Sequence, residues 1–121
     1  MLIVTDGAEA TRSLAERIGA ELRGMQVRIL SAADFHATDM LPADMCFFGA
    51  EEPCPVFYAP VEAVLAHINL AGRRGGVFSP RSKAAVQYLS SIVHDSELAL
   101  YAQPFLGDQS GDMRAWIKNC I

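Results

Sequence analysis

The side chains that most often carry nucleophilic or metal chemistry are scattered along this sequence of 121 residues. The histidines are His36, His67 and His94, and the cysteines are Cys46, Cys54 and Cys120. Their positions lack metal-ligand spacing, and an odd number of cysteines without C-x-x-C argues against a disulfide framework. Cys54 stands between two prolines, where a reactive thiol is conceivable, but no Lys, Arg or His adjoins it to lower its pKa. The sequence also lacks a P-loop and a G-x-G-x-x-G motif.

Small and polar residues instead gather in three segments that each follow an apolar run. We name them the first loop (residues 5–11), the second loop (49–58) and the third loop (79–82). If the apolar runs are parallel strands, their carboxyl ends lie along one edge of the sheet, and ligands bind at that edge. The three loops are therefore the candidate site.

The pattern along the chain supports this arrangement, because short apolar runs alternate with helical periods of about 3.6 residues. Strands are expected over residues 2–4, 25–30, 45–48, 76–78 and 98–102, and helices over 11–23, around 61–68, from about 82, and around 113–120. Residues 35–44 show no clear period and are expected to form a loop or a short helix. With right-handed crossovers, the sequence predicts an α/β fold: a single domain (1–121) with a doubly wound, five-stranded parallel sheet of order 2-1-3-4-5 and helices on both faces.

Composition excludes several classes of protein. A net charge of −4 argues against a general nucleic-acid binder, which needs clustered Lys and Arg, although it suits a basic partner protein. No apolar run approaches the roughly 20 residues that span a bilayer. The first residues lack a signal peptide's basic and long apolar regions. We therefore expect a cytoplasmic protein with no membrane or nucleic-acid partner.

Four stretches resemble the flavodoxin-like family. TDGAEATRSLAERIGAEL resembles the phosphate loop and the helix behind it, and ADMCFFGAEEP resembles the third strand. LAGRRGGVFSPRSKAAVQYL is similar to the fourth strand with its basic lead, and DMRAWIKNCI to the C-terminal helix, which commonly carries a Trp. The resemblance covers nearly the whole chain. It implies a small flavodoxin-like protein that binds FMN and passes electrons to a redox partner protein.

The resemblance also implies which residues hold FMN. Those implied in the first loop, at the phosphate, are Thr5, Asp6, Gly7, Ala8, Glu9, Ala10 and Thr11. Those implied around the flavin ring are Ala50, Glu51, Glu52, Tyr58, Ser79 and Pro80.

The first loop departs from the family pattern of hydroxyls and glycine, because Asp6 and Glu9 add carboxylates. Two unit charges about 5 Å apart, at an effective dielectric near 20, interact by roughly 3 kcal/mol, so a carboxylate that faced the phosphate would weaken binding about a hundredfold. Alternatively, a carboxylate near a helix start turns outward and stabilises the helix N-terminus.

The ring-binding loops depart as well. The third loop is short and contains no aromatic residue. Phe57 and Tyr58 either form one aromatic wall or belong to the core. Arg81 either pairs with an acid or phosphate or is solvated at a helix start.

A response-regulator receiver domain has the same length and strand order. It needs paired acids, an Asp acceptor and a Lys before a Pro. Here only Asp6 follows the first strand, Glu51 cannot form the usual aspartyl phosphate, and Gln103 carries no positive charge. Two hypotheses remain: an FMN-binding electron carrier, and a flavin-free flavodoxin-like or degenerate receiver-like interaction module.

Overall fold

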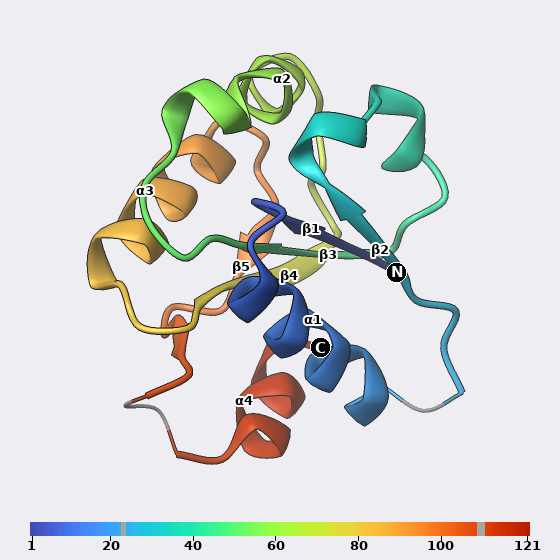
Figure 1. Ribbon diagram of the computed structural model, residues 1–121. Coiled ribbons are helices and arrows are strands. Elements are labelled where there is room, and N and C mark those ends of the chain that lie inside the picture. The colour runs from blue at the N-terminus through green and yellow to red at the C-terminus, as the bar shows by residue number, and fades with distance from the viewer. Residues whose placement is uncertain (23, 109–110) are drawn as a thin grey trace.

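A parallel sheet forms the centre of the computed structural model, and helices cover both of its faces (Figure 1). The structure describes residues 1–22, 24–108 and 111–121. The strands are β1 (Leu2–Thr5), β2 (Arg28–Ser31), β3 (Met45–Gly49), β4 (Arg74–Ser79), β5 (Ala99–Leu100) and β6 (Phe105–Leu106). The helices are α1 (Glu9–Glu21), α2 (Pro55–Leu65), α3 (Lys83–His94) and α4 (Met113–Cys120), with 3-10 helices η1 (Ala32–Asp34) and η2 (Ala37–Asp39).

The strand order β2-β1-β3-β4-β5 confirms the predicted doubly wound sheet. All pairings are parallel, and β1 lies between β2 and β3. The predicted fifth strand, residues 98–102, is shorter than predicted, because β5 covers only Ala99–Leu100, and an additional strand, β6, pairs with β4 after a break that contains Pro104, so the sheet has six strands. Proline has no N–H for a ladder hydrogen bond. At the same break, the indole N–H of Trp116 donates to the carbonyl of Gln103 (2.8 Å). The second strand also begins later than predicted, at Arg28.

Two cores lie on the two faces of the sheet. In Figure 1, α2 and α3 lie on one side of the strands and α1 and α4 on the other. Tyr58, Val61 and Leu65 of α2 share the first core with Leu89 of α3. The second core contains Leu14 and Ile18 of α1 together with Trp116 and Ile117 of α4. Burial of both sheet faces explains why the run at residues 45–48 is continuously apolar.

The first helix starts earlier than predicted, at Glu9, so Thr11 lies inside α1 on its buried face. The last residue predicted for this helix, Arg23, lies outside the described residues. Residues 35–44 contain η2, in agreement with the predicted loop or short helix. None of the helices in the described part of the chain has the length and apolar character to cross a membrane.

Candidate functional site

The carboxylate of Asp6 joins the first and second loops. Its Oδ1 accepts a hydrogen bond from the backbone N–H of Ala8 (3.0 Å), and its Oδ2 accepts one from the backbone N–H of Glu51 (2.7 Å). Gly7, between Asp6 and Ala8, has a φ of 81°, a left-handed conformation that glycine adopts without strain. The turn after β1 is therefore organised around the carboxylate of Asp6, an anion that the protein itself supplies.

An ion pair connects the second loop to the third. Glu51 Oε1 pairs with the guanidinium of Arg81. The third loop is itself held by the buried Ser79, whose Oγ accepts hydrogen bonds from the N–H groups of Arg81 (3.4 Å) and Ser82 (3.0 Å). Asp6, Glu51 and Arg81 thus form one chain of contacts across all three loops.

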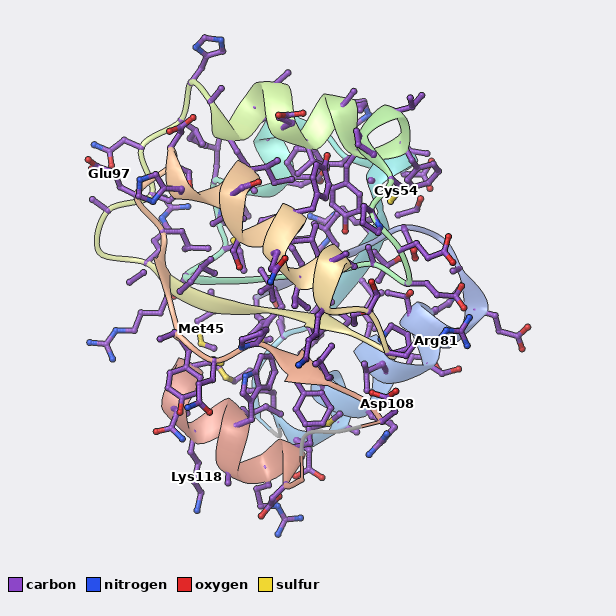
Figure 2. All side chains as sticks on the ribbon, turned by 90° about the vertical axis from the view of Figure 1, so that its left-hand side faces the viewer. Met45, Cys54, Arg81, Glu97, Asp108 and Lys118 are labelled. Carbon is purple, nitrogen blue, oxygen red and sulfur yellow. The ribbon has the colours of Figure 1, made fainter. Side chains whose placement is uncertain are left out.

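A cavity of about 430 Å³ lies among these loops. Its lining residues are Asp6, Glu51, Glu52, Pro53, Cys54, Phe57 and Arg81. Its volume is within the range of about 300–1,000 Å³ that is usual for small-molecule sites. Three carboxylates and one guanidinium give the lining a formal charge of −3 + 1 = −2. In Figure 2, Cys54 and Arg81 lie at the opposite end of the molecule from Met45, where β3 begins. The cavity is therefore at the carboxyl end of the sheet, where ligands of this architecture bind.

The start of α1, in the first loop, offers unused hydrogen-bonding groups. The N-cap residue is Ala8, and no side chain caps the helix. Amide groups in the first turn of a helix have no partner within the helix, and they bind anions well. In addition, the Oγ1 of Thr11 is buried and has no hydrogen-bond partner among the described residues. Among the residues that the structure describes, two kinds of polar group in the first loop thus have no side-chain partner.

Several residues implied by the resemblance lie near this helix start and cavity. Thr5 Oγ1 accepts a hydrogen bond from the N–H of Gly7 (3.2 Å). Glu9 and Ala10 are exposed on the first turn of α1, so the carboxylate of Glu9 is placed to stabilise the helix N-terminus. Glu52 is exposed at the cavity, and Pro80 is half-buried in the third loop.

Tyr58 and Ala50 lie behind the site, in the core. The ring of Tyr58 is fully buried, and its hydroxyl donates to the carbonyl of Gly49 (2.6 Å), with the carbonyl of Val4 also within reach at 3.2 Å. Burial raises the pKa of this hydroxyl well above its ordinary value. Phe57 lines the cavity instead. Tyr58, Val61 and Leu65 have the spacing of one helix face, and Phe57 is one position away from that buried stripe. The sequence therefore contained a signal that separates the buried Tyr58 from Phe57 at the cavity.

Cys54 is a half-buried lining residue at the N-cap of α2. Burial and the negative charge of Asp6 both raise the pKa of its thiol. Since the thiolate is the nucleophile, this environment suppresses the reactivity of Cys54.

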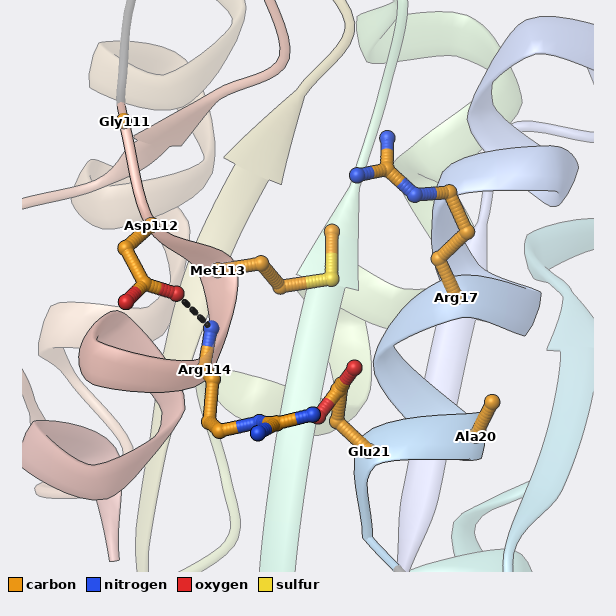
Figure 3. A pocket seen from close by; sticks show the side chains of 7 residues that line it. All are labelled: Arg17, Ala20, Glu21, Gly111, Asp112, Met113 and Arg114. Carbon is orange, nitrogen blue, oxygen red and sulfur yellow. Dashed lines mark hydrogen bonds and ion pairs between the residues drawn. The ribbon is translucent and has the colours of Figure 1, made fainter.

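A second cavity, of about 410 Å³, lies between α1 and α4 (Figure 3). Its charged groups are largely paired within the protein: Arg114 with Glu21 (2.9 Å), and Asp112 with N–H groups at the start of α4. None of the FMN-site residues implied by the resemblance lines this second cavity. Within residues 1–22, 24–108 and 111–121, no group of three or more His, Cys, Asp or Glu is placed to hold a metal ion.

Comparison with solved structures gives strong matches to flavodoxins. The flavodoxin of Streptococcus pneumoniae TIGR4 has a TM-score of 0.81 at 17% sequence identity, over 98% of this chain and 94% of that one. Two-electron reduced Megasphaera elsdenii flavodoxin has a TM-score of 0.75 at 17% identity, over 99% and 98%. A Fusobacterium nucleatum flavodoxin mutant bound to flavin mononucleotide has a TM-score of 0.63 at 12% identity, over 82% and 65%. No protein-family model and no curated protein sequence matches. At these identities the similarity establishes the fold.

Proposed function

We propose that this chain, which has a flavodoxin-like fold, binds FMN at the carboxyl end of its sheet and passes single electrons to a partner protein. The observation that carries the proposal is the start of α1, where an uncapped helix N-terminus coincides with the buried hydroxyl of Thr11, which has no partner in the described part of the chain. A buried hydroxyl without a partner costs about 1–3 kcal/mol, and a phosphate oxygen would give it one. Solved flavodoxins of the same fold include one with bound flavin mononucleotide.

The residues present fit the two ends of FMN unequally. At the phosphate end, the first-turn amides of α1 supply hydrogen-bond donors, and the buried hydroxyl of Thr11 would add one if its side chain turned toward the ligand. At the ring end, the cavity supplies one aromatic face, Phe57, with Pro53 beside it. The third loop adds no aromatic side chain. We therefore expect weak binding.

Bound FMN would supply the one-electron chemistry, and the protein would hold the flavin, cover it and tune its reduction potential. Asp6, Glu51 and Glu52 place negative charge around the cavity. Carboxylates there oppose the gain of further negative charge, so they favour a low reduction potential. The acidic chain, with a net charge of −4, is suited to a basic redox partner.

Titration of the ligand-free protein with FMN tests the proposal, with quenching of flavin fluorescence as the readout. Thr11→Val is the sharpest variant because it keeps the side-chain shape and removes only the hydroxyl. We expect it to raise the free energy of unfolding by about 1 kcal/mol and to weaken FMN binding about tenfold. Absence of quenching at millimolar FMN would exclude the proposal, and unchanged FMN affinity in Thr11→Val would remove its main support.

A flavin-free interaction module is the second candidate, and the Asp6 carboxylate favours it. In the first loop this carboxylate already accepts two backbone N–H bonds, from Ala8 and Glu51, so the protein supplies an anion of its own there. This candidate predicts that the purified protein is colourless, shows no FMN quenching, and unfolds cooperatively without any ligand.

A further inference from the structure

The cavity proposed for the flavin ring ends within the first loop. Of the residues in that loop, Asp6 lines the cavity. Residues 7–11, all of which the structure describes, do not line it, although α1 begins at Glu9. FMN carries its ring at one end and its phosphate at the other. The cavity and the amides at the helix start must therefore be connected before FMN can occupy both.

The ring of Phe57 lies at this boundary. Phe57 is in the first turn of α2, lines the cavity and is half-buried. A Cβ built on Gly7 would lie 3.6 Å from Phe57 Cζ and 3.6 Å from Ser31 Oγ, both at ordinary contact distance. Between the ring tip and the hydroxyl, the space over Gly7 therefore admits a methyl group. A phosphate, with its oxygens arranged around phosphorus, is larger than a methyl group and does not fit there.

We infer that Phe57 separates the ring cavity from the helix start, and that its ring must turn away from Gly7 before FMN can occupy both. The inference rests on the proposed function and names the residue that sets the affinity for FMN relative to that for the bare flavin ring. Gly7 follows Asp6, which lines the cavity, and precedes Ala8, the N-cap residue of α1. The ring therefore contacts the chain where it passes from the cavity to the helix. Phe57 is both a wall of the cavity and a barrier at its end.

This barrier lowers the affinity for FMN, because only the open position of Phe57 accepts the whole ligand. The apparent affinity falls by the fraction of molecules that are competent to bind. A half-buried phenylalanine ring that turns toward solvent gives up part of its burial free energy, which corresponds to an open fraction of about one tenth. Lumiflavin, the flavin ring without the ribityl phosphate, carries nothing past Gly7 and avoids this cost.

Three variants separate the barrier from the wall. Phe57→Ala removes both. Phe57→Leu removes the ring tip that lies over Gly7 but keeps apolar bulk near the backbone, so it replaces Phe57→Ala if the alanine variant does not fold. Val56→Ala is the matched control, because Val56 is the preceding residue of α2, is 92% exposed and does not line the cavity.

The experiment measures the affinities for FMN and lumiflavin by quenching of flavin fluorescence. We expect Phe57→Ala to weaken lumiflavin binding about tenfold through the lost aromatic contact. FMN affinity should stay within about threefold, because the barrier is lost together with the wall. The ratio of FMN affinity to lumiflavin affinity should thus rise about tenfold in Phe57→Ala, less in Phe57→Leu and not in Val56→Ala. An equal loss of both ligands in Phe57→Ala would overturn the inference and leave the flavin proposal standing.

A second measurement follows the contact itself by NMR. In the ligand-free protein, the ring hydrogen on Phe57 Cζ should give a nuclear Overhauser effect to the Cα hydrogens of Gly7. Saturating FMN should remove this signal, whereas lumiflavin should leave it. Absence of the signal without ligand, or its persistence with FMN bound, would overturn the inference. If the wild type binds no flavin but Phe57→Ala binds FMN, the inference holds and the flavin proposal fails. If neither protein binds FMN, both fail.

Discussion

The carboxylate of Asp6 lies 2.7 Å from the backbone nitrogen of Glu51, a residue 45 positions away in the sequence. Its other oxygen accepts the N–H of Ala8 (3.0 Å). One side chain thus closes the turn after β1 and ties it to the loop after β3. This contact gives the candidate site its shape and also places a negative charge within it.

Replacing Asp6 should reduce stability through these two hydrogen bonds. Hydrogen bonds to a charged group contribute about 1.5–3 kcal/mol, so we expect Asp6→Ala to lower the free energy of unfolding by about 2 kcal/mol in urea denaturation. Asp6→Asn keeps one acceptor oxygen and should lose less. Glu9→Ala is the control in the same loop, because Glu9 is exposed and contributes only about 0.5 kcal/mol through the helix dipole. Similar losses in Asp6→Ala and Glu9→Ala would contradict this role.

Gly75 should tolerate no side chain. A Cβ at this position in β4 would lie 1.7 Å from the carbonyl oxygen of Cys46 on the neighbouring β3. Because the obstacle is backbone at the centre of the sheet, we expect Gly75→Ala to cost about 3 kcal/mol or more, seen as a large fall in melting temperature. Gly111→Ala is the matched control, since a Cβ there meets nothing within 4 Å. A Gly75→Ala protein with wild-type stability would show that β3 and β4 are not packed as described.

Glu97 is in a strained backbone conformation that glycine would relieve. Its φ is 62°, and its N–H donates to the carbonyl of His94 (3.2 Å) at the end of α3. The left-handed region costs a non-glycine residue roughly 1–2 kcal/mol, so we expect Glu97→Gly to raise the free energy of unfolding by about 1 kcal/mol. Glu97→Ala removes the carboxylate but keeps the strain. If it stabilised the protein equally, loss of charge rather than backbone relief would be the cause.

The three thiols should differ in their reaction with iodoacetamide. Burial raises the pKa of Cys46 to about 11 and that of Cys120 to about 12, whereas Cys54 is half-buried and has a smaller upward shift. A higher pKa leaves less thiolate at a given pH, so at pH near 8 we expect Cys54 to react first and the other two only after unfolding. Mass spectrometry of the alkylated peptides reports the order.

The same reaction tests the charge of Asp6. This carboxylate raises the pKa of Cys54, so Asp6→Asn should lower the pKa and accelerate alkylation near pH 8. At a pH far above the thiol pKa, wild type and variant should converge, because both are then fully ionised. A difference that persists at high pH would indicate a loosened loop instead of an altered pKa.

The sequence by itself was sufficient to predict the scaffold. Local backbone geometry sets the period at which side chains face the core, and this period appears in the run at residues 45–48 and in the stripe of Leu14, Ile18 and Leu22. Burial of these apolar side chains holds the layers together. The order of the strands followed from right-handed crossovers. The break in the last strand was not predicted, because it depends on Pro104 and on a contact from Trp116, which lies 13 residues after its acceptor, Gln103.

Only the tertiary structure decided how the site is composed. The sequence predicted three loops at one edge of the sheet, but left open whether Asp6, Glu9 or Arg81 faces a ligand. In the structure, the Asp6 carboxylate accepts a hydrogen bond from the backbone N–H of Glu51, Glu9 is exposed, and Arg81 pairs with Glu51. It also buries Tyr58 and leaves Phe57 at the cavity. Local propensity does not contain these choices, because each depends on partners that come close only when distant strands align.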